Sequence, residues 1–158
     1  MTDLHNTPAY IVSAEHLPER LLAAVSTELD IASVPARFAE FLNQVYSTAR
    51  AEGIALDGLN VFVYRDSGPD RAAIDFGVGV NAPFEARGAM KCTVTPAGLV
   101  AHTTHRGEYR GLRNAHAAVK KWCADNGHAL AGPRWEAYGH WTEDASNLET
   151  EVCYLLRS

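Results

Sequence analysis

Cysteine is scarce in this chain, and the cysteines that are present form no framework. Cys92, Cys123 and Cys153 are odd in number, lie far apart and include no Cys-x-x-Cys pair. A small disulfide-stabilised domain or a zinc site would show closely spaced, paired cysteines. The sequence therefore predicts reduced, partly buried thiols in place of a disulfide scaffold or a cysteine-based zinc centre.

Long apolar runs and an excess of basic residues are also missing. No stretch approaches the roughly eighteen apolar residues of a membrane span, and residues 1–8 lack the basic start and apolar core of a signal peptide. The formal net charge is −5, whereas a surface that binds nucleic acid is usually basic. We therefore expect a cytoplasmic protein with no membrane or direct nucleic-acid partner, and with residues 1–8 as a flexible arm.

Motifs for common cofactors and nucleophiles are absent as well. The sequence has no Walker loop, dinucleotide fingerprint or nucleophile elbow. His102 and His105 have the spacing of some metal ligands, but positions three apart on a strand face opposite sides of a sheet. The sequence thus predicts neither a metal nor a cofactor.

The most informative feature that is present is an internal repeat. Residues 53–64 and 127–138 align 74 positions apart, with Gly, Ala, Leu, Gly and Tyr recurring in register. A second match upstream aligns Pro18 with Pro96. Two collinear matches indicate a duplicated unit. Because each half is small for an independent core, we expect two modules, about 9–82 and 88–158, that share one core within a domain covering 9–158.

Hydrophobic periodicity predicts the same order of elements in both halves, and the expected fold class is α+β. The predicted elements are strands at 10–15 and 20–27, a helix from Ser33 or Pro35 to Gly53, strands at 60–64 and 73–80, strands at 90–95 and 99–105, a helix from about Leu112 to Gly127, and strands at 134–138 and 149–156. The first two strands are expected to form a hairpin at Pro18. The whole is expected to be two pseudo-symmetric strand–helix–strand–strand modules in one antiparallel sheet, with helices on one face and a ligand cleft on the other.

Strand alternation divides the two best-defined strands into an apolar face and an aromatic face. The apolar face is expected to pack on the helices and consists of Val61, Val63, Trp135 and Ala137. The opposite face carries an acid among aromatic side chains: Phe62, Tyr64, Glu136 and Tyr138. Three aromatic side chains on a face that helices leave free favour a ligand pocket. Gly77 and Gly79 on a neighbouring strand are expected to leave room there.

Glu136 is the candidate functional acid, because it takes the position that Phe62 holds in the first half. A carboxylate in an aromatic cavity is costly to desolvate, so its pKa should rise. A lipophilic cation would compensate the charge and stack on the rings. The alternative is an exposed glutamate paired with Arg134 or Arg65, and alternation does not decide between the two.

Other residues complete the candidate site. Tyr64 and Tyr138 recur in register and are either pocket walls or core tyrosines with satisfied hydroxyls. Trp141 follows the strand and is a candidate lid, while Tyr109 opens the second helix and lines the pocket or packs under the sheet. Glu151, a second acid, and Cys153 occupy the positions that match the two glycines, and whether they face the cleft depends on the strand register, which the sequence leaves open.

Several short motifs in the second half resemble the GyrI-like small-molecule-binding domain, which is also the effector-binding domain of AraC- and MerR-type regulators. The resemblance covers about residues 10–157. It rests on the motifs His105-Arg-Gly-Glu-Tyr109, Trp122 with Gly127, Gly132-Pro-Arg-Trp-Glu-Ala-Tyr138, Glu149-Thr-Glu-Val-Cys-Tyr154 and, in the first half, Asp75-Phe-Gly-Val-Gly-Val80. Glu108 and Leu155-Leu156 stand where the family usually has proline.

The resemblance implies ligand binding in a cleft between two modules, with Glu136 at the position of the glutamate that meets cationic lipophilic drugs. It also implies that a chain without a DNA-binding module is not itself a regulator.

Three functions follow as hypotheses. The first is a binder of lipophilic, cationic small molecules, with Glu136, Tyr138, Phe62, Tyr64, Tyr109 and Trp141 as ligand contacts. The second is a hydrolase of cyclopropane-bearing DNA-alkylating compounds, with Glu136 as general base and Tyr138 assisting. The third is a protein-interaction module acting on a partner such as DNA gyrase or a regulator; a homodimer is a further expectation.

Overall fold

The computed structural model describes residues 10–157, so the predicted arm at residues 1–8 lies outside the described residues. The elements in order are β1 (Ser13–Leu17), β2 (Leu21–Asp30), η1 (Ile31–Ser33), α2 (Val34–Glu52), β3 (Leu56–Gly68), β4 (Arg71–Val80), β5 (Met90–Val94), β6 (Gly98–Arg106), η2 (Tyr109–Gly111), α3 (Leu112–Asp125), β7 (Leu130–Tyr138), η3 (Ala145–Asn147) and β8 (Glu149–Leu156). The α+β class and the repeated order of elements are confirmed. None of the described helices is both long and apolar enough to cross a bilayer.

Local chemistry accounts for both ends of α2 and for the end of α3. Proline lies in the first turn of α2, where its missing N–H costs nothing. The helix ends at Gly53, which adopts the left-handed conformation (φ 71°) that favours glycine. At the end of α3, Gly127 has the same conformation (φ 72°). The repeated glycines of the sequence are therefore helix-terminating residues.

One antiparallel sheet joins the two halves, in the order β1-β6-β8-β7-β3-β4-β2-β5. At its centre, β3 pairs with β7, and Phe62 lies directly opposite Glu136. These two residues occupy the same position of the repeat, so the pseudo-twofold axis passes between them. At the axis, the phenyl ring of the first module therefore lies opposite the carboxylate of the second module.

The predicted hairpin at Pro18 is wrong, because the first strands of the two halves are exchanged. β1 pairs with β6 of the second half, and β5 pairs with β2 of the first half. The partner of a strand depends on the whole sheet, whereas the proline between two strands reports only a break in the chain. A local pattern therefore could not distinguish a hairpin from this exchange.

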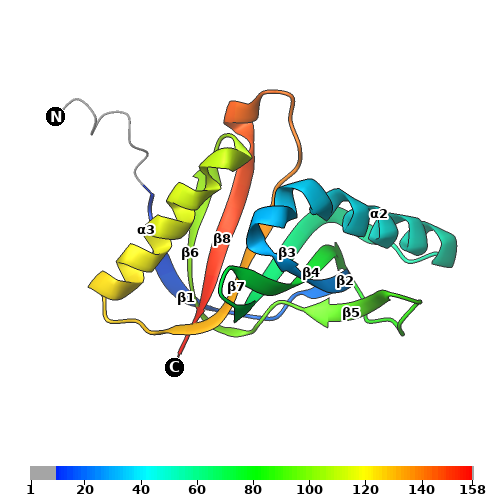
Figure 1. The fold of residues 1–158 in the computed structure, drawn as a ribbon, viewed down its shortest axis with the longest axis horizontal. Helices are drawn as coiled ribbons and strands as arrows, with labels where there is room; N and C mark the ends of the chain where they lie inside the picture. The colour runs from blue at the N-terminus through cyan, green and yellow to red at the C-terminus, as the bar shows by residue number, and fades with distance from the viewer. Residues whose placement is uncertain (1–9, 158) are drawn as a thin grey trace.

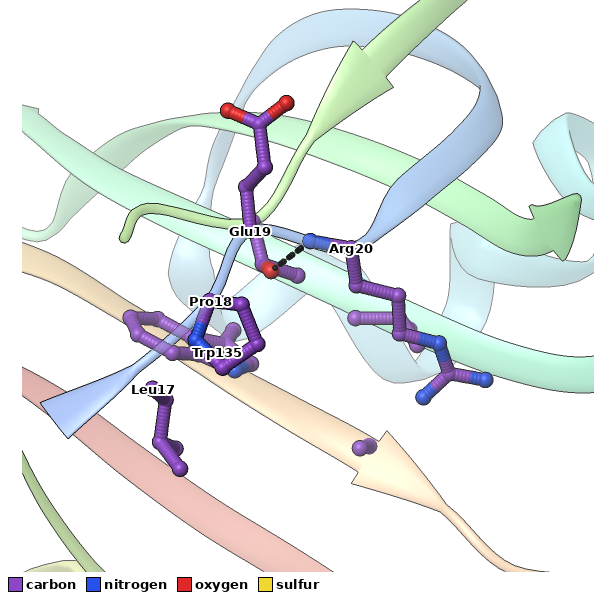
Figure 2. A pocket seen from close by; sticks show the side chains of 8 residues that line it. Leu17, Pro18, Glu19, Arg20 and Trp135 are labelled. Atoms are coloured by element: carbon purple, nitrogen blue, oxygen red, sulfur yellow. Dashed lines mark hydrogen bonds between the residues drawn. The ribbon is translucent and has the colours of Figure 1, made fainter. Parts of the chain in front are cut away.

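The exchange forces the sheet to curl. β1 and β2 lie six strand spacings apart, which would be nearly 30 Å in a flat sheet, yet the connector from Leu17 to Leu21 spans at most about 14 Å. The two connectors meet over the centre of the sheet: Arg20 N–H donates to Thr95 Oγ1 at 2.9 Å, and Thr95 N–H donates to the carbonyl of Arg20 at 2.9 Å. Figure 2 shows the Leu17–Arg20 connector passing over the strand that carries Trp135.

The assignment of sheet faces needs correction. α2 and α3 cover the face that carries Phe62 and Glu136 (Figure 1), since Phe38 of α2 lies 5.9 Å from Phe62 between ring centroids, and His116 of α3 bonds Glu136. The helices therefore flank the cleft on its own face instead of covering the opposite one. The opposite face is covered by the crossing connectors, over a buried cluster of Leu22, Val61, Val63, Val100, Trp135 and Cys153.

The corrected assignment of the sheet faces also changes the expected role of Gly77 and Gly79. A Cβ on Gly77 would lie 3.1 Å from the side chain of Leu22 on the connector face. On Gly79 it would collide with the carboxylate of Asp57. Both glycines therefore make room for side chains of the fold, and neither makes room for a ligand in the cleft.

His102 on β6 connects strand β1 to the strands of the second half. His102 Nε2 lies 2.7 Å from Glu15 on β1, and Nδ1 lies 2.6 Å from Glu151 on β8. Burial opposes protonation of this imidazole, but the two carboxylates outweigh burial and raise the pKa of His102. One side chain thus links three strands.

We expect His102→Gln to lower the free energy of unfolding more at pH 5.5 than at pH 8.5. A raised pKa means that the stabilisation is fully present below the unfolded-state pKa, about 6.5, and is lost as pH rises through the folded-state value. Because the cluster is partly exposed, the difference should stay below about 1 kcal/mol. Urea unfolding at both pH values measures it, with His16→Gln, at an exposed position of β1, as control. An equal loss at both pH values would contradict the assignment.

Candidate ligand-binding site

A cavity of about 1300 Å³ lies between α2 and α3 over the centre of the sheet. Its floor comes from β3 and β7, and its side walls come from the two helices. All six residues predicted as ligand contacts line it: Phe62, Tyr64, Tyr109, Glu136, Tyr138 and Trp141. The alternation of side chains along two strands thus identified the residues of one face, although it placed the helices wrongly.

Glu136 is buried at the floor of this cavity, with 8 % of its surface exposed. Its Oε2 lies 2.7 Å from His116 Nε2, and its Oε1 accepts hydrogen bonds from the hydroxyls of Tyr138 at 2.6 Å and Tyr64 at 3.4 Å. The alternative of an exposed glutamate paired with arginine is wrong, because Glu136 is buried, Arg134 pairs with Asp66 at 2.8 Å and Arg65 pairs with Asp75 at 3.3 Å. The carboxylate is instead held by three polar groups inside the cavity.

The predicted rise in the pKa of Glu136 is also wrong. Burial alone would raise it, but the hydrogen bond and charge of His116, together with the hydroxyls of Tyr138 and Tyr64, hold the pKa below its ordinary value. Burial in turn raises the pKa of Tyr138 and of Tyr64, so both phenols remain protonated donors at neutral pH. The prediction failed because it considered desolvation without the partners.

His116 is the central residue that the sequence reasoning missed. It lies on α3, and its Nδ1 is 2.7 Å from the hydroxyl of Tyr154 on β8, so a continuous polar chain runs from Tyr154 through His116 to Glu136. In the sequence, His116 belongs to no metal-ligand or catalytic motif, so nothing local singles it out. Its two partners lie on β7 and β8, 20 and 38 residues away in the chain, and no local motif records such contacts.

The repeat itself contained the missing signal. His116 aligns with Leu42, a buried core residue of α2, at the same offset of 74 that aligns Glu136 with Phe62. Tyr154 pairs with Arg134 just as Val78 pairs with Asn60. All three polar members of the chain therefore replace apolar residues of the first half. The site is the place where the second copy departs from the first.

Aromatic rings surround the carboxylate. The ring of Tyr138 lies 5.0 Å from that of Phe62 and 5.4 Å from that of Tyr109, between centroids. Trp141 lies at the rim in the β7–β8 loop with 70 % of its surface exposed, and Tyr109 is 38 % exposed. An apolar ligand entering the cavity would therefore meet ring faces at its floor and an exposed indole at its mouth.

The remaining candidates lie elsewhere. Glu151 bonds His102, and Cys153 belongs to the buried cluster on the connector face, so neither reaches the cleft. Within residues 10–157, no group of three or more His, Cys, Asp or Glu side chains is arranged to hold a metal ion. A second cavity of about 410 Å³ lies on the connector face, lined by Leu17, Pro18, Glu19, Arg20, Val61, Thr95, Trp135 and Ala137 (Figure 2).

The duplicated modules and the cleft between their helices define a small-molecule-binding domain. A model of the GyrI-like small molecule binding domain matches residues 12–157, and the chain belongs to that family. No curated protein matches the chain.

Solved structures share the fold. The EcmrR C-terminal domain superimposes with a TM-score of 0.78 at 20% identity, over 94% of this chain and 98% of that chain. SAV2435 bound to tetraphenylphosphonium gives a TM-score of 0.65 at 9% identity, over 96% and 95%. A hydrolase from Listeria innocua gives 0.65 at 11% identity, over 99% and 96%.

We expect the carboxyl group of Glu136 to titrate below its ordinary value in wild type and above it in His116→Gln. Removing the imidazole leaves the burial that opposes ionisation and takes away the largest opposing partner. Carbon-13 NMR of the side-chain carboxyl over pH 3–8 measures both values, with the exposed Glu143 as internal reference. The assignment of His116 would be contradicted by a Glu136 pKa that is unchanged in the variant.

Proposed function

We propose that this domain binds lipophilic cations, with Glu136 as the counter-charge and the surrounding rings as the apolar surface. One observation carries the proposal: among residues 10–157, Glu136 is the only buried carboxylate, and it faces a cavity of about 1300 Å³. A buried, ionised acid attracts a cation far more strongly than a solvated one. Each ring that stacks on the cation adds roughly 0.5–2 kcal/mol.

The neighbouring structure of SAV2435 with tetraphenylphosphonium supports the cationic character of the ligand, because tetraphenylphosphonium is a lipophilic cation. The network around Glu136 shapes how such a cation would bind. The hydroxyls of Tyr138 and Tyr64 hold one carboxylate oxygen, whereas His116 holds the other. An incoming cation therefore meets a carboxylate whose two oxygens are both already hydrogen-bonded.

We expect Glu136→Gln to weaken binding of rhodamine 6G at least tenfold, about 1.4 kcal/mol. Glutamine keeps the shape and the hydrogen-bonding carbonyl but removes the negative charge. A fluorescence titration at pH 7.5 measures the affinity, and Glu143→Gln at the exposed β7–β8 loop is the matched control. Equal affinity of wild type and Glu136→Gln for the dye, or no binding by either protein, would contradict the proposal.

Hydrolysis of a reactive small molecule is the second candidate, favoured by the structural similarity to the hydrolase from Listeria innocua. The lowered pKa of Glu136 makes it a weaker general base than a raised one would be, which places this candidate second. Mass spectrometry of alkylating substrates incubated with the protein distinguishes turnover from binding. Contact with DNA gyrase, with a regulator or with a second copy stays a prediction.

A further inference from the structure

The charges that line the cleft are segregated, and one wall is cationic. Five residues of α3 line the cavity, at helical spacing: Leu112, Arg113, His116, Ala117 and Lys120. Arg113 and Lys120 lie near the two ends of this stripe, about 10 Å apart along the helix axis. The facing wall, from η1 and α2, is apolar and consists of Ile31, Val34, Pro35 and Phe38.

Arg113 and Lys120, the two cations of α3 that line the cavity, differ from the two arginines elsewhere in its lining, because no carboxylate neutralises them. Arg134 pairs with Asp66 at 2.8 Å, and Arg110 pairs with Glu108 at 2.6 Å. Within residues 10–157, no carboxylate lies within ion-pair distance of Arg113 or Lys120. An unpaired cation on the wall of a cavity is available to an anionic group of a ligand.

Among residues 10–157, none of the acids that line the cavity pairs with Arg113 or Lys120. Glu136 on the floor bonds His116, and Asp66 pairs with Arg134. Asp70 lies in the β3–β4 turn beside η1, where its backbone carbonyl accepts from Ile31 N–H at 2.8 Å. A ligand that spans the cleft therefore passes from a negative floor to a positive wall. A purely cationic ligand would meet repulsion along α3, whereas a ligand with an acidic group there would not.

We propose that the ligand class of this cleft is the lipophilic zwitterion: an aromatic body with a cationic centre held at Glu136 and an acidic group, a carboxylate or its equivalent, held by Arg113 and Lys120. This inference rests on the proposed function, because it adds a second anchoring point to the cation site. Arg113 and Lys120 act as specificity residues that contact the ligand, and Glu136 remains the cation anchor.

Rhodamine B and its ethyl ester test the proposal, because they share one cationic chromophore and differ only in a free carboxylate. In 20 mM salt, wild type should bind rhodamine B threefold to tenfold more tightly than the ester. The double variant Arg113→Gln/Lys120→Gln should remove this preference by weakening rhodamine B alone. Raising the salt to 300 mM should reduce the preference, since exposed charges are screened.

The controls separate this inference from the proposed function. Lys121→Gln changes the neighbouring lysine, which pairs with Asp125 and does not line the cavity, and should leave both affinities unchanged. Wild type binding the ester as tightly as the acid, or a double variant that weakens both dyes equally, overturns the zwitterion proposal while the cation site stands. Failure of both dyes to bind, or ester binding that is indifferent to Glu136→Gln, overturns the cation site and the inference with it.

Discussion

A single buried carboxylate at the pseudo-twofold axis is the constraint on which the rest of the site depends. An ionised group in a protein interior is costly unless charges or hydrogen bonds compensate it. At Glu136 that compensation comes from His116 on α3, Tyr138 on β7 and, at longer range, Tyr64 on β3. Helix α3 and the centre of the sheet are therefore tied to each other through one side chain.

The duplication explains both the stability of this arrangement and its asymmetry. The first half keeps an apolar core under its helix, where Phe41 stacks on Phe76 with 5.1 Å between ring centroids. The second half replaces Leu42, Phe62 and Val78 by His116, Glu136 and Tyr154 in equivalent positions. One copy supplies rigid apolar packing, and the other supplies polar chemistry, within a cavity that both enclose. The function of such a site depends on the residues that differ between the two copies, because the fold alone does not specify function.

Much of the fold followed from the sequence, because helix ends, strand alternation and the repeat are local properties. The helix-terminating glycines Gly53 and Gly127 and the cleft residues Phe62, Tyr64, Glu136 and Tyr138 were predictable on those grounds. Strand exchange was not, since the partner of β1 is set by the curled sheet as a whole. The helix side of the sheet was assigned wrongly because an aromatic face was expected to lie away from helices, whereas here it lies between them. His116 and the lowered pKa of Glu136 required knowledge of contacts between distant elements.

The pairing of His116 with the buried carboxylate gives the most direct test of this account. Removing His116 alone leaves a buried carboxylate without its main partner, whereas removing the charge of Glu136 at the same time leaves nothing to compensate. Urea unfolding of wild type, His116→Gln, Glu136→Gln and the double variant at pH 7 measures the coupling between the two side chains. The account predicts that the double variant loses less unfolding free energy than the sum of the single losses, by at least about 0.5 kcal/mol. Additive losses would contradict it.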